Sequence, residues 1–294
     1  MIGEGAPKFD VKLSNEYFDG GFVFFPVKRA KVRQLLTKIN PQFGNKEVKL
    51  ALPSKHALQD LIPGDEHVAM LSYGYVDALA FKDALTCDEK NTVSTTLEFL
   101  GIDVPYLTSD GGDRISITLQ KDLFTPDVGN YIQANVILPT PKIADRFDKT
   151  ERGNTVNILF EKGDLQLNLT GIYSETIAND DHAIEDMEEY ENEYQISQRG
   201  PDFSICEQFP DIQVDLCDIH WNPLYNAALK RAGTNVCIKW EPTADVTSQM
   251  STFYIESISK EMKALLLLDE DQNVVEGSVQ RGTFDIRLVF PCIV

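Results

Sequence analysis

Two residues in the C-terminal half of the chain have the types and spacing of zinc ligands. Cys217 and His220 lie three positions apart, at the end of a stretch with strand periodicity. A thiolate and an imidazole presented in this way suit Zn²⁺, and Cys206 and Cys237 are candidates to complete a tetrahedral site. The cysteines follow no regular spacing, however, and free cysteine is commonly buried in protein cores. A structural role for these thiols is therefore the competing interpretation.

Known catalytic motifs are absent from the sequence. It contains no GxSxG nucleophile elbow, no GxxxxGK[ST] or GxGxxG phosphate loop and no HExxH metalloprotease helix. With four histidines among 294 residues, acid–base chemistry would fall to carboxylates. No pair of these carboxylates is distinguished by its spacing. We therefore assign no catalytic residue, and we expect no cofactor apart from the candidate zinc ion.

A basic segment near the N-terminus is a candidate binding surface. Residues 20–46 contain no acid, and residues 27–39 have the apolar spacing of an amphipathic helix that begins after Pro26. Its cations could simply face solvent, or they could contact the phosphates of nucleic acid, as in clamp-like proteins that are acidic overall. The candidate partner-binding residues here are Lys28, Arg29, Lys31, Arg33 and Lys38.

An acidic segment is the natural electrostatic partner of that helix. Residues 163–198 contain ten acids and neither lysine nor arginine. Ile184, Met187, Tyr190 and Tyr194 would share one helical face, so the segment is either a helix that orders on docking or a solvated loop. Its candidate partner-binding residues are Glu185, Asp186, Glu188, Glu189 and Glu193. Contact with the basic helix of a neighbouring copy would be head-to-tail and would build rings, shells or tubes.

The elements that would position these residues are mostly strands in the C-terminal half. Residues 156–169 alternate between apolar and polar types on both sides of Lys162-Gly163-Asp164, which predicts a hairpin. Similar alternation predicts strands over 212–216, 236–240 and 284–290, and an apolar strand over 264–268. A short helix is expected from Asn222 to Gly233.

The N-terminal half is mixed. A hairpin is predicted about Asp19-Gly20-Gly21, and a helix is predicted over 88–100, with Gly101 and Ile102 as its C-terminal cap. Strand periodicity returns over 115–119 and 132–138.

Composition places the chain among globular proteins of a reducing compartment. It is 43% hydrophobic and has a formal net charge of −19, which disfavours binding to nucleic acid or anionic membranes outside the basic segment. Five widely spread cysteines without a CxxC motif indicate free thiols, and the first residues lack a secretory signal pattern. The longest aliphatic run, 264–268, is too short to cross a membrane.

Together these patterns predict an α+β protein that is predominantly β. Antiparallel sheets would form a β-sandwich or jelly-roll-like fold with a few short amphipathic helices. A boundary is expected at 145, between a mixed region 1–145 and a β-rich region 146–294, although one large β domain is the alternative. The leading functional hypothesis is a non-enzymatic, self-assembling subunit, such as a virion component, whose partners are other copies of itself or associated structural proteins. The alternatives are a clamp-like nucleic-acid-associated factor and a hydrolase with an unrecognised carboxylate site.

Overall fold

The computed structural model describes the chain in ten ranges: 9–39, 48–50, 65–78, 95–109, 117–128, 141–173, 228–231, 237–242, 247–269 and 272–290. The strands of the first half are β1 (Phe9–Lys28), β2 (Val48–Leu50), β3 (Glu66–Ala78), β4 (Thr95–Ser109), β5 (Ile117–Thr125) and β6 (Lys142–Ile143). Those that follow are β7 (Arg146–Arg152), β8 (Thr155–Lys162), β9 (Leu165–Tyr173), β10 (Ala228–Arg231), β11 (Cys237–Pro242), β12 (Thr247–Ile258) and β13 (Val274–Phe290). The described helices are α1 (Arg29–Ile39) and α5 (Lys260–Leu265).

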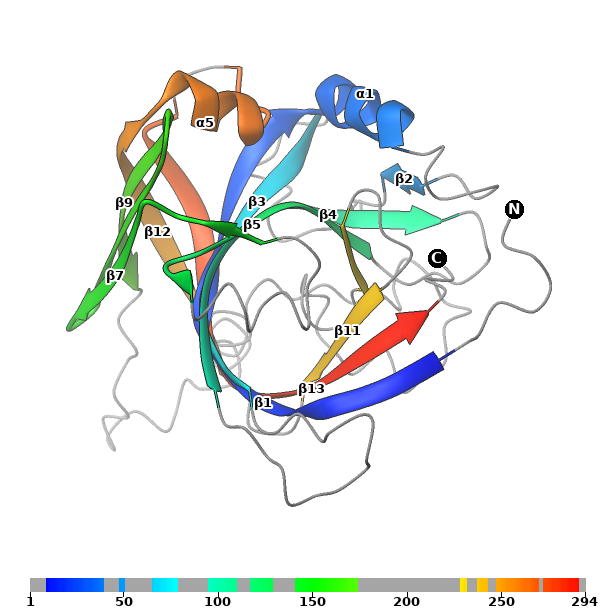
Figure 1. Cartoon of the computed structure of the whole chain (residues 1–294). Coiled ribbons are helices and arrows are strands. Elements are labelled where there is room, and N and C mark those ends of the chain that lie inside the picture. Colours follow the sequence, from blue (N-terminus) through cyan, green and yellow to red (C-terminus); the bar gives the residue numbers. More distant parts are fainter. Residues whose placement is uncertain are drawn as a thin grey trace, which may run out of the picture.

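Within these ranges the strands form one curled sheet that closes on itself. Strand β1 pairs with β3 on one side and with β13 on the other, so the path β1-β3-β4-β5-β10-β11-β13 is a ring. In Figure 1, β1 and β13 run side by side along the lower part of the view, and β11 lies next to β13. Most pairings are antiparallel, whereas β5 pairs in parallel with β10 and with β6.

A branch of four strands leaves the ring at β13. The first half of β13 pairs with β12 and its second half with β11, so one long strand belongs to both parts of the sheet. From β12 the branch continues through β9 and β8 to β7, which is its outer strand. The branch curls over one face of β1, β3 and β4, and α5 packs beside β9 at its end (Figure 1).

The hydrophobic core lies between this branch and the ring. Alternate residues of the ring strands, such as Val23, Leu71 and Ile102, pack with Ile158 and Phe253 of the branch. Because strand side chains alternate between faces, the residues between them project the other way. The branch covers the core face, so that opposite face of β1, β3 and β4 lines the interior of the ring.

The structure confirms the clearest sequence predictions. Strands β8 and β9 form the expected hairpin about Gly163, whose positive φ of 55° suits glycine in a tight turn. Helix α1 occupies the predicted basic segment and buries Val32, Leu36 and Ile39. The strands predicted over 236–240 and 284–290 correspond to β11 and β13, and β5 overlaps the strand predicted over 115–119.

The predicted turn at Gly20-Gly21 is wrong, because β1 continues straight through it. Gly20 lies opposite Gly74 of β3, and a Cβ added at Gly20 would lie 2.1 Å from the carbonyl oxygen of Tyr73. At Gly21 a Cβ would lie 2.5 Å from the Tyr73 hydroxyl oxygen. These glycines therefore permit close packing within the sheet and do not reverse the chain.

Three other predicted elements differ from the structure. Residues 95–109 form β4 where a helix was predicted up to residue 100, and Gly101 and Ile102 lie inside that strand. Residues 260–265 form α5, so the run 264–268 is not a strand; Ser259 caps this helix by accepting from the Met262 amide. Residues 228–231 form β10 where a helix was predicted. The strands predicted over 132–138 and 212–216 lie outside the described residues.

The fold is predominantly β with few helices, as the sequence predicted. The described strands belong to one continuous sheet rather than to the two facing sheets of a sandwich or jelly roll, because β13 and β1 carry the hydrogen bonding from the ring into the branch. The domain boundary at residue 145 falls between β6 and β7 and stays a prediction. Among the described residues, no helix is long and apolar enough to cross a membrane.

Candidate active site

A buried carboxyl group lies on the face of the sheet that lines the ring. Asp103 is in the middle of β4, opposite Met70 of β3 and Gln120 of β5, and is only 2% exposed. A carboxyl group is costly to bury without partners, because its ionised form loses the solvation of water. Its placement in the centre of a sheet therefore needs a functional explanation or a compensating contact.

One compensating contact comes from the neighbouring strand. The Ser72 hydroxyl donates a hydrogen bond of 2.6 Å to Oδ2 of Asp103, and both groups are buried. The other carboxyl oxygen, Oδ1, has no hydrogen-bond partner among the described residues. Gly101 makes the contact possible, since a Cβ there would lie 2.4 Å from the Ser72 Oγ. The site thus has one oxygen held by a hydrogen bond and one buried oxygen without a partner among the described residues.

Burial shifts the pKa of this carboxyl group toward neutral pH. Loss of solvation raises the pKa of Asp103 from its ordinary value to about 7, and the hydrogen bond from Ser72 opposes that rise. At neutral pH the protonated and ionised forms are then present in comparable amounts. A group with this property can both donate and accept a proton under physiological conditions.

The surroundings of Asp103 on this face are largely apolar. Phe22, Phe24 and Met70 are buried beside it on β1 and β3. Ser278 of β13 lies opposite Phe22, is fully buried, and has a hydroxyl without a partner among the described residues. An acid, two hydroxyls and an apolar wall therefore share one face, over three neighbouring strands and β13.

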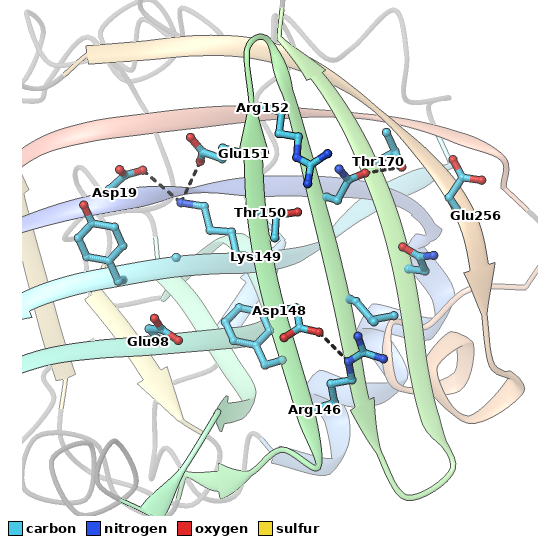
Figure 2. A pocket seen from close by; sticks show the side chains of 16 residues that line it. Asp19, Glu98, Arg146, Asp148, Lys149, Thr150, Glu151, Arg152, Thr170 and Glu256 are labelled. Atoms are coloured by element: carbon cyan, nitrogen blue, oxygen red, sulfur yellow. Dashed lines mark hydrogen bonds and ion pairs between the residues drawn. The ribbon is translucent and has the colours of Figure 1, made fainter.

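A second polar site lies on the outside of the branch. An open groove of about 1150 Å³ follows β7, with strands β1, β3 and β4 on one flank and β8, β9 and β12 on the other. Figure 2 shows Asp19 and Glu151 reaching the Lys149 amine from two directions. Arg281 of β13 contacts the same two carboxylates, at 3.2 and 2.8 Å. Lys149 also lies over the Tyr73 and Tyr75 rings, at 5.9 and 5.6 Å from their centroids.

Most of the predicted zinc ligands lie outside the described residues. Cys206, Cys217 and His220 lie outside the described residues, and Cys237 is described only through its backbone in β11. In the part of the chain that is described, no group of three or more His, Cys, Asp or Glu residues is arranged to hold a metal ion. The zinc site therefore stays a prediction.

Several cations of the predicted basic surface have partners within the same chain. Lys28 pairs with Glu66 at 3.0 Å, Arg29 donates to the Glu66 carbonyl oxygen, and Lys31 contacts Asp269 beyond α5. These contacts fix α1 against the ring. Arg33 and Lys38 are on the exposed side of the helix. The predicted acidic partners Glu185, Asp186, Glu188, Glu189 and Glu193 lie outside the described residues.

Sequence reasoning missed Asp103 and Ser72, although both carry a readable signal. Asp103 is an isolated acid in the apolar run Leu100 to Val104, and Ser72 interrupts the apolar alternation of 68–76. A lone polar residue on an apolar strand face is the kind of inconsistency that marks a functional site. Assigning residues 88–100 to a helix concealed it.

Comparison with known proteins yields no family model and no curated relative that matches this chain. Solved structures give weak fold similarity. Enduracididine biosynthesis enzyme MppR with HEPES bound is 8% identical with a TM-score of 0.46, covering 97% of this chain and 90% of that chain. An acetoacetate decarboxylase from Legionella pneumophila is 9% identical with a TM-score of 0.36, covering 99% and 93%. Similarity at this level assigns neither a family nor an activity.

The prediction of a non-enzymatic, self-assembling subunit is corrected by the contacts of the basic segment. Lys28, Arg29 and Lys31 engage groups of their own chain, so the electrostatic basis of the prediction does not hold for these residues. A segment can carry a large excess of one charge and still have its charged side chains paired within the same chain.

Proposed function

We propose that this protein is an enzyme that transfers a proton to or from a small, uncharged substrate, with Asp103 as the acid and base. The observation that carries the proposal is the buried Asp103 carboxyl group, which is held through Oδ2 by Ser72 and has Oδ1 without a partner among the described residues. A carboxyl group raised in pKa by an apolar environment is suited to this role.

The reaction class that fits best is proton exchange at a carbon next to a carbonyl group. The ionised carboxylate takes the proton through Oδ1; the C–H electron pair becomes the C=C bond of an enolate, and the carbonyl π pair moves onto the oxygen. The Asp103 carboxyl group then returns the proton to the same carbon, and the carbonyl group re-forms. The reaction is balanced without a cofactor, because the electrons stay in the substrate and the proton taken by Asp103 is given back.

Ser72 sets the ionisation of Asp103 in this scheme. It favours the ionised form, so part of the carboxyl population stays ionised, and able to accept a proton, near neutral pH. Ser278 lies three strands from Asp103, about 14 Å across the sheet at ~4.8 Å per strand. The enolate oxygen forms next to the carbon that Asp103 deprotonates, so Ser278 has no part in this step.

The apolar wall limits the charge of the substrate. Phe22, Phe24 and Met70 offer no counter-charge, so an anionic substrate would meet both desolvation and the repulsion of the ionised Asp103. Ketones and aldehydes with a short hydrocarbon body satisfy these conditions.

Deuterium exchange tests the proposal directly. The protein is incubated in D₂O with a panel of small ketones and aldehydes, and deuterium incorporation beside the carbonyl group is followed by NMR. We expect exchange with at least one compound and a loss of about 100-fold or more in Asp103→Asn. Asp122→Asn is the matched control, because Asp122 is a buried acid of β5 that pairs with Lys142 at 2.7 Å. Exchange in no compound, or equal rates in the wild type and Asp103→Asn, would overturn the proposal.

A further inference from the structure

The groove along β7 has features of a ligand site separate from the Asp103 site. Strand β7 runs through it, and its residues alternate between the two flanks. In Figure 2, Lys149 and Glu151 face Asp19, whereas Thr170 and Glu256 lie on the other side of β7. Asp103 is not among the lining residues.

Five of the charged side chains that line the groove are already paired with one another. Lys149 contacts Asp19 at 3.3 Å and Glu151 at 3.0 Å, and Arg146 contacts Asp148 at 2.6 Å. A strongly charged ligand would have to compete with one partner of an existing pair. A neutral ligand can add hydrogen bonds without breaking any of these pairs, so the paired part of the groove favours ligands without net charge.

Hydrogen-bonding capacity remains after these pairs are formed. Oδ1 of Asp19 contacts both Lys149 and Arg281, and Oδ2 of Asp148 contacts Arg146. Each of these two carboxylates therefore keeps its second oxygen to accept a hydrogen bond from a ligand. Asn157 accepts from Thr170 at 3.0 Å through Oδ1, which leaves its amide nitrogen to donate. Acceptors and donors thus occur together along β7. A hydroxyl group, which donates and accepts at once, matches this arrangement.

The dimensions of the groove indicate an extended ligand. The seven residues of β7 span about 20 Å at ~3.3 Å per residue. The volume of about 1150 Å³ lies just above the range of roughly 300 to 1,000 Å³ for pockets that hold one small molecule. Leu159 and Tyr75 add apolar surface among the polar groups, as a ligand with both hydroxyl groups and C–H faces requires.

From these features we propose that the β7 groove binds a neutral oligosaccharide. The ligand lies along β7 on the side of β8, with its hydroxyl groups on Asp148 and Asn157 and a C–H face on Leu159. Binding is independent of proton transfer at Asp103, so this proposal stands or falls separately from the proposed function.

Calorimetric titration of the full chain tests it. The panel contains neutral hexasaccharides of glucose, xylose and N-acetylglucosamine, an acidic oligogalacturonide, and an extended peptide with alternating charges. We expect at least one neutral hexasaccharide to bind, with an affinity that is unchanged between about 0.05 and 0.5 M NaCl because no net charge is involved. Asp148→Asn and Asn157→Ala should each weaken that affinity by about tenfold or more, as expected for the loss of a hydrogen bond to a charged or fixed group.

Two variants serve as controls. Asp164→Asn makes the same chemical change as Asp148→Asn at the exposed turn between β8 and β9, so it should bind as the wild type does. Asp103→Asn should also bind normally, which separates the two sites. The proposal is overturned if no neutral hexasaccharide binds, or if one binds and neither groove variant weakens it. Binding of only the acidic sugar or the peptide, with strong salt dependence, would likewise contradict it.

Discussion

At the scale of single residues, the central feature is an acid whose two oxygens have different surroundings. Oδ2 of Asp103 accepts from Ser72, and Oδ1 has no hydrogen-bond partner among the described residues. Burial and this hydrogen bond act on the pKa in opposite directions, and burial has the larger effect. The balance between them places the pKa close to neutrality, where proton transfer is efficient.

Removal of the Ser72 hydroxyl should shift that balance. In Ser72→Ala the ionised carboxylate loses its donor, so we expect the pKa of Asp103 to rise by about 1 to 2 units above its wild-type value. The pH profile of deuterium exchange should move upward by the same amount. Ser251→Ala is the matched control, since Ser251 is a buried serine on the core side of β12 whose hydroxyl has no partner among the described residues. A Ser72→Ala profile that coincides with the wild type would show that the hydroxyl does not act on Asp103.

At the scale of elements, the close contact of β1 with β3 positions the site. Gly20 and Gly74 are directly paired, and no side chain separates the two strands at that point. The contact holds β1 beside β3, the strand that carries Ser72, and keeps the apolar wall next to Asp103.

Gly20→Ala should therefore be strongly destabilising. The new Cβ would lie 2.1 Å from the Tyr73 carbonyl oxygen, which is backbone and cannot move without disturbing the β1–β3 ladder. We expect a loss of about 3 kcal/mol or more in the free energy of unfolding, measured by urea denaturation. Gly153→Ala is the comparison, because its Cβ meets no atom within 4 Å and only the positive φ of 60° is strained, at about 1 kcal/mol. Similar losses in the two variants would contradict this account of β1.

The sequence predicted those elements whose stability is local. The β8–β9 hairpin has strict alternation and a glycine turn, and α1 has an apolar face and a start after proline, so each could be read from neighbouring residues. Strand β4 could not, because residues 95–100 become a strand by pairing with β3, whose partner residues lie 17 to 27 positions earlier. The site depends on the same long-range pairing: Ser72 and Asp103 are 31 positions apart in the sequence.

At the scale of the whole molecule, two buried groups make opposite contributions to stability as pH changes. Burial lowers the pKa of His67 to about 4, and the Nε2 of its neutral ring lies 3.0 Å from the Pro105 carbonyl oxygen. Its contribution to stability is present above pH 6.5 and is lost as pH falls toward 4, because the unfolded state binds the proton first. Asp103 has a raised pKa, so its contribution is present below pH 3.8 and is lost as pH rises toward 7.

Between pH 4 and 6.5 each group changes the free energy of unfolding by about 1.4 kcal/mol per pH unit, in opposite directions. The two pH dependences should therefore nearly cancel. Asp103→Asn should remove one of them, so its free energy of unfolding relative to the wild type should increase as pH rises from 4 to 7. His67→Gln keeps a donor for the Pro105 carbonyl oxygen. Its free energy of unfolding relative to the wild type should increase as pH falls over the same window. Urea denaturation at several pH values measures both differences. Variants whose stability runs parallel to the wild type would show that the two groups keep ordinary pKa values in the folded protein.

The most direct test of the account is the titration of Asp103 itself. The carbonyl stretch of a protonated carboxyl group is visible in the infrared, and the difference between the wild type and Asp103→Asn isolates the band of this residue. We predict that the band persists at pH 6 and is lost through a midpoint close to pH 7. A midpoint near 4, the ordinary value for aspartate, would contradict the assignment of Asp103 as the proton-transfer group.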